Sequence, residues 1–77
     1  MFTYNIAKEA DNQEFEKACQ RIESGITDLK KEDVLVDVDG SVIQIYRKNK
    51  SKIKVYNDYE VDAVYIDSDI DLAKIIN

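Results

Sequence analysis

The chain contains no histidine, and its one cysteine is Cys19. Histidine is the usual general base near neutral pH and the commonest ligand of transition metals, so its absence argues against zinc chemistry and against Ser-His or Cys-His catalysis. A single cysteine allows no intramolecular disulfide and no multi-cysteine metal site. We therefore expect a protein that is not an enzyme, that uses no cofactor and that works in a reducing compartment, the cytoplasm.

Long apolar runs are also absent. The first ten residues, MFTYNIAKEA, have neither a basic segment nor a long apolar stretch, so we expect no signal peptide, and no segment predicts a membrane-spanning helix. At 77 residues and 44% hydrophobic composition, residues 1–77 are expected to form a single globular domain. A domain of this size buries only about 60% of its unfolded surface, so self-association as a homodimer would help to stabilise it.

The net charge of −5 is unevenly distributed along the chain. Residues 47–54 contain five basic residues and no acid, whereas the first 46 residues contain ten acids and five bases, and the last 23 contain six acids and one base. A basic segment between two acidic segments predicts that charge is used to recognise a partner.

The first half of the chain predicts a strand and then a helix. Alternating apolar residues predict a strand over residues 2–7. Asp11 followed by Glu14 is typical of a capping box, and apolar residues at helical spacing predict a helix over residues 12–24, ended by Gly25 in the left-handed C′ position. Cys19 lies on or beside the apolar stripe of that helix, so we interpret it as a small buried hydrophobe. A polar connection at residues 27–32 follows.

Residues 33–47, DVLVDVDGSVIQIYR, predict a β-hairpin with a two-residue type I′ turn at Asp39-Gly40. This turn would pair Val38 with Ser41. The side chains expected on the buried face of the hairpin are then those of Val34, Val36, Val38, Ile43 and Ile45.

Further strands are predicted at residues 52–56 and at residues 61–67, the second at an edge of the sheet, with a turn at Asn57-Asp58 between them. Residues 52–56 share the buried face with Ile43 only if the preceding turn has an odd number of residues. Ser68 is predicted to cap a short helix that ends at Asn77, with Asp71 at its N3 position. The expected fold is α+β: a small antiparallel sheet of three to five strands in the order β-α-β-β-β-β-α, one main helix on one face and a short C-terminal helix.

Two short motifs resemble known sites. VLVDVDGS at residues 34–41 is similar to the first motif of haloacid-dehalogenase-like phosphatases, which implies Asp37 as nucleophile, Asp39 as acid/base and a bridging Mg²⁺. That family needs a loop of a large parallel α/β sheet after the motif, whereas this chain continues into another strand, so we interpret Asp39 as a turn residue and Asp37 as a solvent-facing strand residue. DSDIDL at residues 67–72 resembles the start of an EF-hand loop but has Leu72 where the loop requires glycine.

Two surfaces are candidates for binding. The basic hairpin at residues 46–56 is expected to present four residues on the outer face of the sheet, in the pattern that single-stranded nucleic acid binding uses: Tyr46, Lys52, Lys54 and Tyr56. The acidic overall charge argues against nucleic acid as the partner.

The second surface is a row of carboxylates that recur at every second residue. On an extended strand such residues lie about 6.6 Å apart on one face, close to the spacing of phosphates along a nucleic-acid strand. We interpret Asp69 and Asp71 as favoured by the dipole of the last helix. The candidate partner-binding residues of this row are Asp58, Glu60, Asp62 and Asp67.

The sequence therefore favours a small acidic protein-binding module that inhibits a basic, nucleic-acid-handling protein, such as a nuclease, by covering its surface. In size and charge it is similar to phage-encoded inhibitors of host defence nucleases, among them anti-CRISPR proteins, and to the immunity proteins of nuclease toxins. A nucleic-acid-binding module that uses residues 46–56 and a self-associating structural subunit are the alternatives. No membrane partner is expected.

Overall fold

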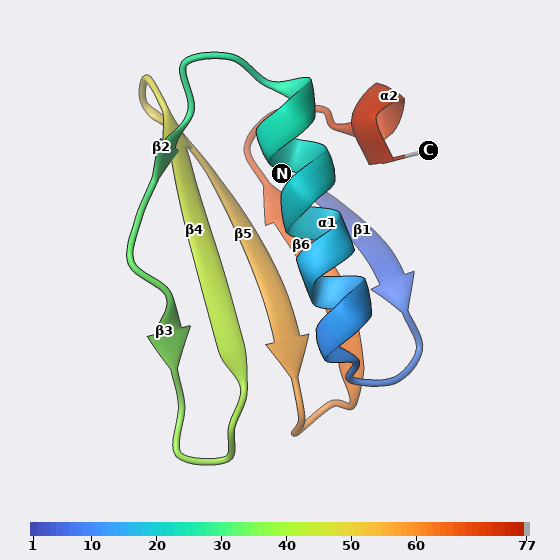
Figure 1. Ribbon diagram of the computed structural model, residues 1–77. Helices are drawn as coiled ribbons and strands as arrows, with labels where there is room; N and C mark the ends of the chain where they lie inside the picture. The colour runs from blue at the N-terminus through green and yellow to red at the C-terminus, as the bar shows by residue number, and fades with distance from the viewer. Residues whose placement is uncertain (77) are drawn as a thin grey trace.

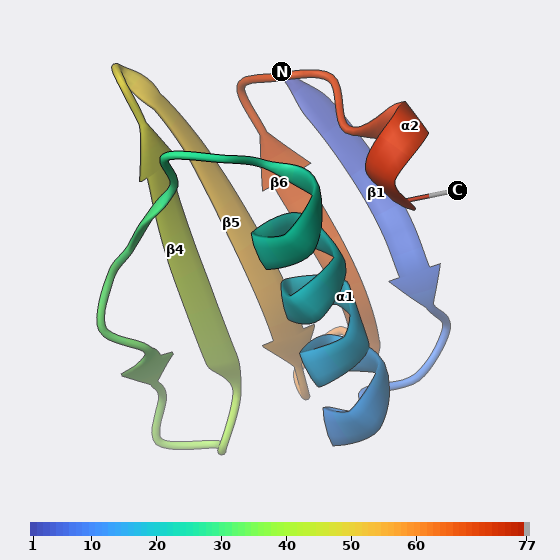
Figure 2. The same ribbon diagram turned by 45° about the horizontal axis from the view of Figure 1, so that its top comes forward.

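The computed structural model describes residues 1–76 as an antiparallel sheet with both helices on one of its faces (Figures 1 and 2). The strand order is β1-β6-β5-β4-β2, and β3 also pairs with β4, which makes six strands within the described residues. This arrangement confirms the predicted α+β fold. The elements are β1 (Phe2–Ala7), α1 (Asn12–Gly25), β2 (Lys30–Lys31), β3 (Leu35–Val36), β4 (Val42–Lys48), β5 (Ser51–Asp58), β6 (Ala63–Ser68) and α2 (Ala73–Ile76).

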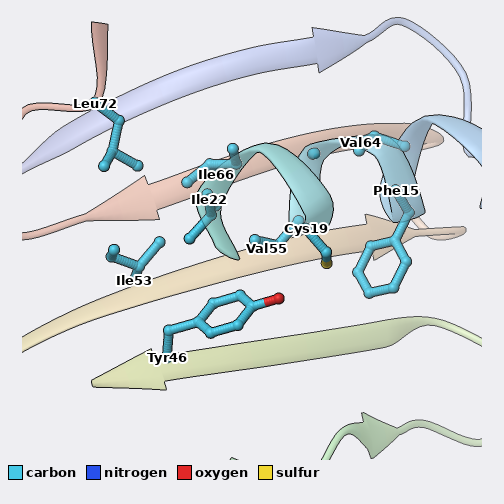
Figure 3. Packing of buried hydrophobic residues seen from close by; sticks show 10 residues of the cluster. Phe15, Cys19, Ile22, Tyr46, Ile53, Val55, Val64, Ile66 and Leu72 are labelled. Carbon is cyan, nitrogen blue, oxygen red and sulfur yellow. The ribbon is translucent and has the colours of Figure 1, made fainter. Parts of the chain in front are cut away.

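The core lies between α1 and the inner faces of β4, β5 and β6 (Figure 3). It contains Phe15, Ala18, Cys19, Ile22, Tyr46, Ile53, Val55, Val64, Ile66 and Leu72. Burial raises the pKa of the Cys19 thiol, which agrees with its interpretation as a small hydrophobe. Neither helix within residues 1–76 is long and apolar enough to cross a membrane.

The start of α1 is the one predicted, with one difference. The Asp11 side chain accepts hydrogen bonds from the backbone N–H groups of Gln13 and Glu14, at 2.8 and 3.2 Å. The Asp11 N–H, which a full capping box would give to the Glu14 carboxylate, donates instead to Oδ1 of Asn57 at 3.0 Å. Because Asn57 is 1% exposed and ends the buried face of β5, this bond fixes the start of the helix to the sheet.

The predicted role of Gly25 is wrong. Gly25 is the last residue of α1, and its backbone is not left-handed. A Cβ at this position would lie 2.9 Å from Cγ2 of Ile75, so the glycine makes room for α2.

The C-terminal helix starts later than predicted because Ser68 is the buried last residue of β6. The Ser68 hydroxyl bonds with the backbone of Ile70, and Asp71 instead accepts the N–H of Ala73 at 2.9 Å. The Tyr4 hydroxyl donates to Asp71 at 2.9 Å and accepts from the N–H of Leu72 at 2.7 Å, which ties this segment to β1. The predicted end of the helix at Asn77 lies outside the described residues.

The predicted two-residue turn at Asp39-Gly40 is also wrong. β3 and β4 are joined by a loop of residues 37–41, with Val36 opposite Val42 and Leu35 opposite Ile43. Only Gly40 in this loop has a positive φ, of 89°. The Asp39 side chain accepts the N–H of Ser41 in an Asx turn, and the Asp37 side chain accepts the N–H of Val38. Backbone bonds from Asp37 to Ser41 and from Gly40 to Asp37 close the loop, so side-chain and backbone bonds together stabilise a connection longer than two residues. Val34, Val36 and Val38 are exposed instead of buried, because β3 is a short strand at the edge of the sheet.

The turn between β4 and β5 has two residues, an even number, because Lys48 pairs with Ser51. Asn49 adopts the left-handed φ of 56° that the turn requires. Tyr46 therefore lies opposite Ile53 on the helix-covered face, and Ile43 and Ile45 point to the uncovered face. The expectation that Ile43 and Ile45 are core residues and Tyr46 an outer residue is wrong: Tyr46 is 0% exposed.

β6 is a central strand between β1 and β5, not the edge strand that was predicted. The β5–β6 turn occupies residues 59–62, later than the predicted Asn57-Asp58 turn, and Asp62 in it has a φ of 57°. Val64 and Ile66 face the helix, whereas Tyr65 faces the uncovered side. The edges are formed by β1 and by the short β2 and β3.

The buried Tyr46 connects the core to a surface ion pair. Its hydroxyl donates to the Glu23 carboxylate, which also lies 3.1 Å from the Lys31 ammonium. Burial and then the Glu23 bond raise the pKa of Tyr46. The Tyr46 bond, followed by Lys31, lowers the pKa of Glu23, so this bond stabilises the fold when Glu23 is ionised.

Tyr46→Phe should lower the free energy of unfolding at neutral pH by about 1.5 kcal/mol, the low end for a hydrogen bond to a charged group, because the Glu23 carboxylate is partly exposed. The depressed pKa of Glu23 means that this contribution is present above the ordinary glutamate pKa and is lost as pH falls through the folded-state pKa. Urea unfolding at neutral pH and at about pH 3 measures both effects. Tyr59→Phe, at a half-exposed ring, is the control. A Tyr46→Phe loss that does not shrink in acid would contradict the assignment.

Candidate functional site

The uncovered face of the sheet carries an apolar row. Leu35 lies opposite Ile43, Ile43 opposite Tyr56, and Tyr56 opposite Tyr65, so the row crosses β3, β4, β5 and β6. Ile45 follows Ile43 on the same face of β4, and Leu35 is 53% exposed. The solvent face of an antiparallel sheet is normally polar, so a continuous apolar row on it indicates a contact surface.

Two tyrosines form the centre of this apolar row. The rings of Tyr56 and Tyr65 stack, with their centroids 4.5 Å apart and an interplanar angle of 14°. The Tyr65 hydroxyl donates to Oδ2 of Asp58 at 3.1 Å. Burial and then the Asp58 carboxylate raise the pKa of Tyr65 to about 12. The rings are thus held in a fixed arrangement.

One end of the sheet collects acidic residues from three connections: residues 8–11, the β3–β4 loop and the β5–β6 turn (Figure 1). The connections touch one another, because the N–H of Ala10 donates to Asp62 and the N–H of Tyr59 donates to the Ser41 hydroxyl, both at 2.9 Å. Lys8 is the one basic residue there. We refer to this region as the acidic end; its carboxylates are Glu9, Asp11, Asp37, Asp39, Asp58, Glu60 and Asp62.

Several of these carboxylates stabilise their own turns. Asp58 accepts the N–H groups of Glu60 and Val61, and the Ser41 N–H lowers the pKa of Asp39 by bonding to its carboxylate. Within residues 1–76, the Glu9 and Glu60 side chains accept no hydrogen bond, and none of the ion pairs includes a carboxylate of the acidic end. The negative charge of the acidic end is therefore not neutralised inside the molecule.

A hollow of about 260 Å³ lies where the apolar row meets the acidic end. We refer to it as the acidic hollow. Its apolar lining comes from Leu35, Val36, Val42, Ile43 and Tyr56, and its carboxylates are Asp37, Asp39, Asp58 and Glu60. The hollow therefore combines an apolar wall, one aromatic ring and a negative rim.

The structure brings together three of the four acids that the sequence singled out. Asp58, Glu60 and Asp62 lie at one turn, but the turn is not extended, so they do not form the expected ladder. Asp67 lies apart from them: it stands opposite Lys54, about 13 Å along the strands from the Asp58 position, and accepts a bond from the Thr3 hydroxyl at 2.9 Å.

Sequence reasoning missed the contribution of the β3–β4 loop to this region. Asp37 and Asp39 were interpreted only as strand and turn residues, and Ile43 as a core residue. Their position at the hollow depends on the register of β3 against β4 and on the parity of the β4–β5 turn. The one available signal was the alternation of apolar and acidic residues in VLVDVDG.

The basic surface is only partly as predicted. Lys52, Lys54 and Tyr56 share the uncovered face, as expected. Tyr46 does not, and one face of the Tyr56 ring is occupied by Tyr65. The lysines are therefore accompanied by at most one ring face, and not by the two aromatic rings that were expected for stacking on single-stranded bases.

The two motifs with family resemblance fold as connections between ordinary elements. The loop that contains Asp37 and Asp39 leads directly into β4. Asp69 accepts the N–H of Lys52 at 2.9 Å, and Asp71 caps α2. Within residues 1–76, no three acidic or cysteine side chains lie close enough together to hold a metal ion.

Asp58→Asn should lower the pKa of Tyr65 from about 12 towards, but not down to, its ordinary value of 10, because burial remains when the carboxylate charge is removed. The measurement is an NMR titration of the tyrosine ring carbons at alkaline pH. Asp39→Asn, which does not contact Tyr65, should leave the Tyr65 midpoint unchanged. An unchanged midpoint in Asp58→Asn would show that the Asp58 bond does not exist in solution.

The chain matches no protein-family model, and no curated protein and no solved structure is significantly similar to it. Function must therefore be inferred from the apolar row, the acidic end and the hollow between them.

Proposed function

We propose that the protein is a binding module that docks its uncovered sheet face and its acidic end on a basic surface of another protein. One observation carries this proposal: the acidic hollow continues directly from the apolar row, so a single surface offers both apolar contact and unneutralised negative charge. A standard interface needs about 800 Å² from each partner, which one face can supply in a molecule with 5229 Å² of accessible surface.

The two parts of this surface have different roles. Burial of the apolar row supplies affinity, at roughly 25 cal/mol per Å² of apolar area. The acidic end accelerates association with a positively charged partner and makes it sensitive to salt. The β4–β5 turn lies at the opposite end of the sheet, with Lys50 in it and Lys48 at the end of β4 (Figure 1), so the charge distribution also orients the approach.

A basic protein surface of this kind is typical of proteins that handle nucleic acid. We infer that the partner is a nuclease or another nucleic-acid-binding effector, and that docking inhibits it by occupying the surface that nucleic acid would use. Anti-CRISPR proteins of phages and immunity proteins of nuclease toxins act in this general way, and the same role is proposed for this chain. The buried Tyr46 and the stacked Tyr56 favour this proposal over nucleic-acid binding by residues 46–56.

Glu60→Lys should release the partner, whereas the equal charge change Glu16→Lys on the exposed face of α1 should not. Glu60 is suited to this test because its side chain makes no bond within residues 1–76, unlike Asp58 and Asp62, whose reversal would disturb the turn. The measurement is capture on the immobilised protein from a lysate of the native host cells. Glu60→Lys should capture less of the partner. The purified partner should then bind Glu60→Lys about tenfold more weakly than the unmodified chain, mostly because association is slower.

Competition identifies the surface that is covered. The captured protein should be basic, and an excess of an oligonucleotide should displace it. Light scattering of the free protein measures its molar mass. It tests the alternative in which two copies of the chain form a dimer through the sheet face opposite α1. Equal capture by Glu60→Lys, or a captured protein that nucleic acid does not displace, would overturn the proposed function.

A further inference from the structure

We propose that the acidic hollow receives the side chain of one arginine of the partner protein. This inference rests on the proposed function and identifies the group that the site recognises. It is carried by the size of the hollow, by the chemistry of its wall and by the charges on its rim.

The size of the hollow fits a single side chain. At about 260 Å³, it is smaller than the roughly 300–1,000 Å³ of pockets that hold drug-sized ligands and cofactors. Leu35 and Val36 form one wall, and Ile43 and Tyr56 contribute the apolar surface from β4 and β5. Such a wall suits the methylene stem of a long side chain, because these stems pack on apolar surfaces while the charged group stays at the rim.

The rim requires a positive charge. Asp37 uses Oδ1 for the Val38 N–H, so its second oxygen remains available, and the Glu60 carboxylate accepts no bond within residues 1–76. Asp39, which is bonded to the backbone and side chain of Ser41, adds its negative charge to the rim. The occupant is not expected to be a metal ion, because no three carboxylates within the described residues converge to hold one. The occupant must therefore have an apolar stem to pack on the wall and a positive charge, delocalised over several atoms, to meet the carboxylates of the rim.

Arginine fits these conditions better than lysine. One face of the Tyr56 ring is stacked on Tyr65 of β6, so its other face is directed towards β4, where Ile43 lies opposite it and lines the hollow together with it. A guanidinium group is planar, stacks on aromatic faces and is less strongly hydrated than an ammonium group. It also binds carboxylates through several parallel hydrogen bonds, which matches carboxylates arranged around a rim.

An NMR titration of the ¹⁵N-labelled full chain tests this inference without knowledge of the partner. The probes are three blocked tripeptides, acetyl-Gly-X-Gly-amide, in which X is arginine, lysine or the neutral arginine analogue citrulline. The arginine peptide should give saturable amide shifts confined to residues 35–43 and 56–60. The lysine peptide should bind at least threefold more weakly, and the citrulline peptide should produce no saturable shift.

Two substitutions locate the binding. The first is Asp37→Asn, which keeps the oxygen that accepts the Val38 N–H, so the loop should remain folded. The second is Glu60→Gln, which breaks no hydrogen bond because the Glu60 side chain makes none within residues 1–76. Each substitution should weaken arginine binding at least threefold. Glu16→Gln on α1 removes the same charge at a distance and should leave binding unchanged.

Equal binding of the arginine and lysine peptides, or equal binding by Asp37→Asn and the unmodified chain, would overturn the inference. Its failure can be separated from failure of the proposed function. If no arginine peptide binds but Glu60→Lys still releases the captured partner, only the arginine pocket is wrong. If the arginine peptide binds the hollow but no basic protein is captured, the proposed function fails.

Discussion

The tight turn between β4 and β5 decides which side chains of the sheet are buried. Lys48 pairs with Ser51 across only Asn49 and Lys50, and Asn49 adopts the left-handed conformation that so short a turn needs. An even number of turn residues places Tyr46 beside Ile53 under the helix. The same parity leaves Ile43, Ile45 and Tyr56 on the face that neither helix covers.

The antiparallel connections then gather charge that is scattered in the sequence. Three connections meet at one end of the sheet because β1, β3 and β5 all run towards it (Figure 1). Their aspartates accept backbone N–H groups of the turns, which holds several carboxylates in fixed positions beside the apolar row. A preorganised negative rim beside an apolar wall loses less conformational entropy on binding than mobile side chains would. The fold itself thus produces the surface to which we assign function.

Local signals in the sequence predicted the local parts of the structure. The Asp11 cap and the helical spacing of Phe15 and Ile22 were sufficient for α1, because a helix is specified by nearby residues. The uncovered face was not predicted, because a change of one residue in a turn exchanges the two faces of a strand. Asp39-Gly40 is typical of a two-residue turn, but the Asx turn of Asp39 and the backbone bonds between Asp37 and Ser41 and between Gly40 and Asp37 favour a loop of five residues. The hollow depends on both of these turns, so the alternation of apolar and acidic residues in VLVDVDG was not sufficient to place it.

The central claim is that the apolar row, half-buried at Ile43 and Tyr56 and exposed at Leu35, lies on the face opposite α1 and not under it. Line broadening of side-chain NMR signals by a soluble nitroxide tests it most directly. The signals of Leu35, Ile43 and Tyr56 should lose intensity, whereas those of Ile53, Val55 and Tyr46 should be protected. Protection of Ile43 together with broadening of Tyr46 would reverse the two faces and contradict the account.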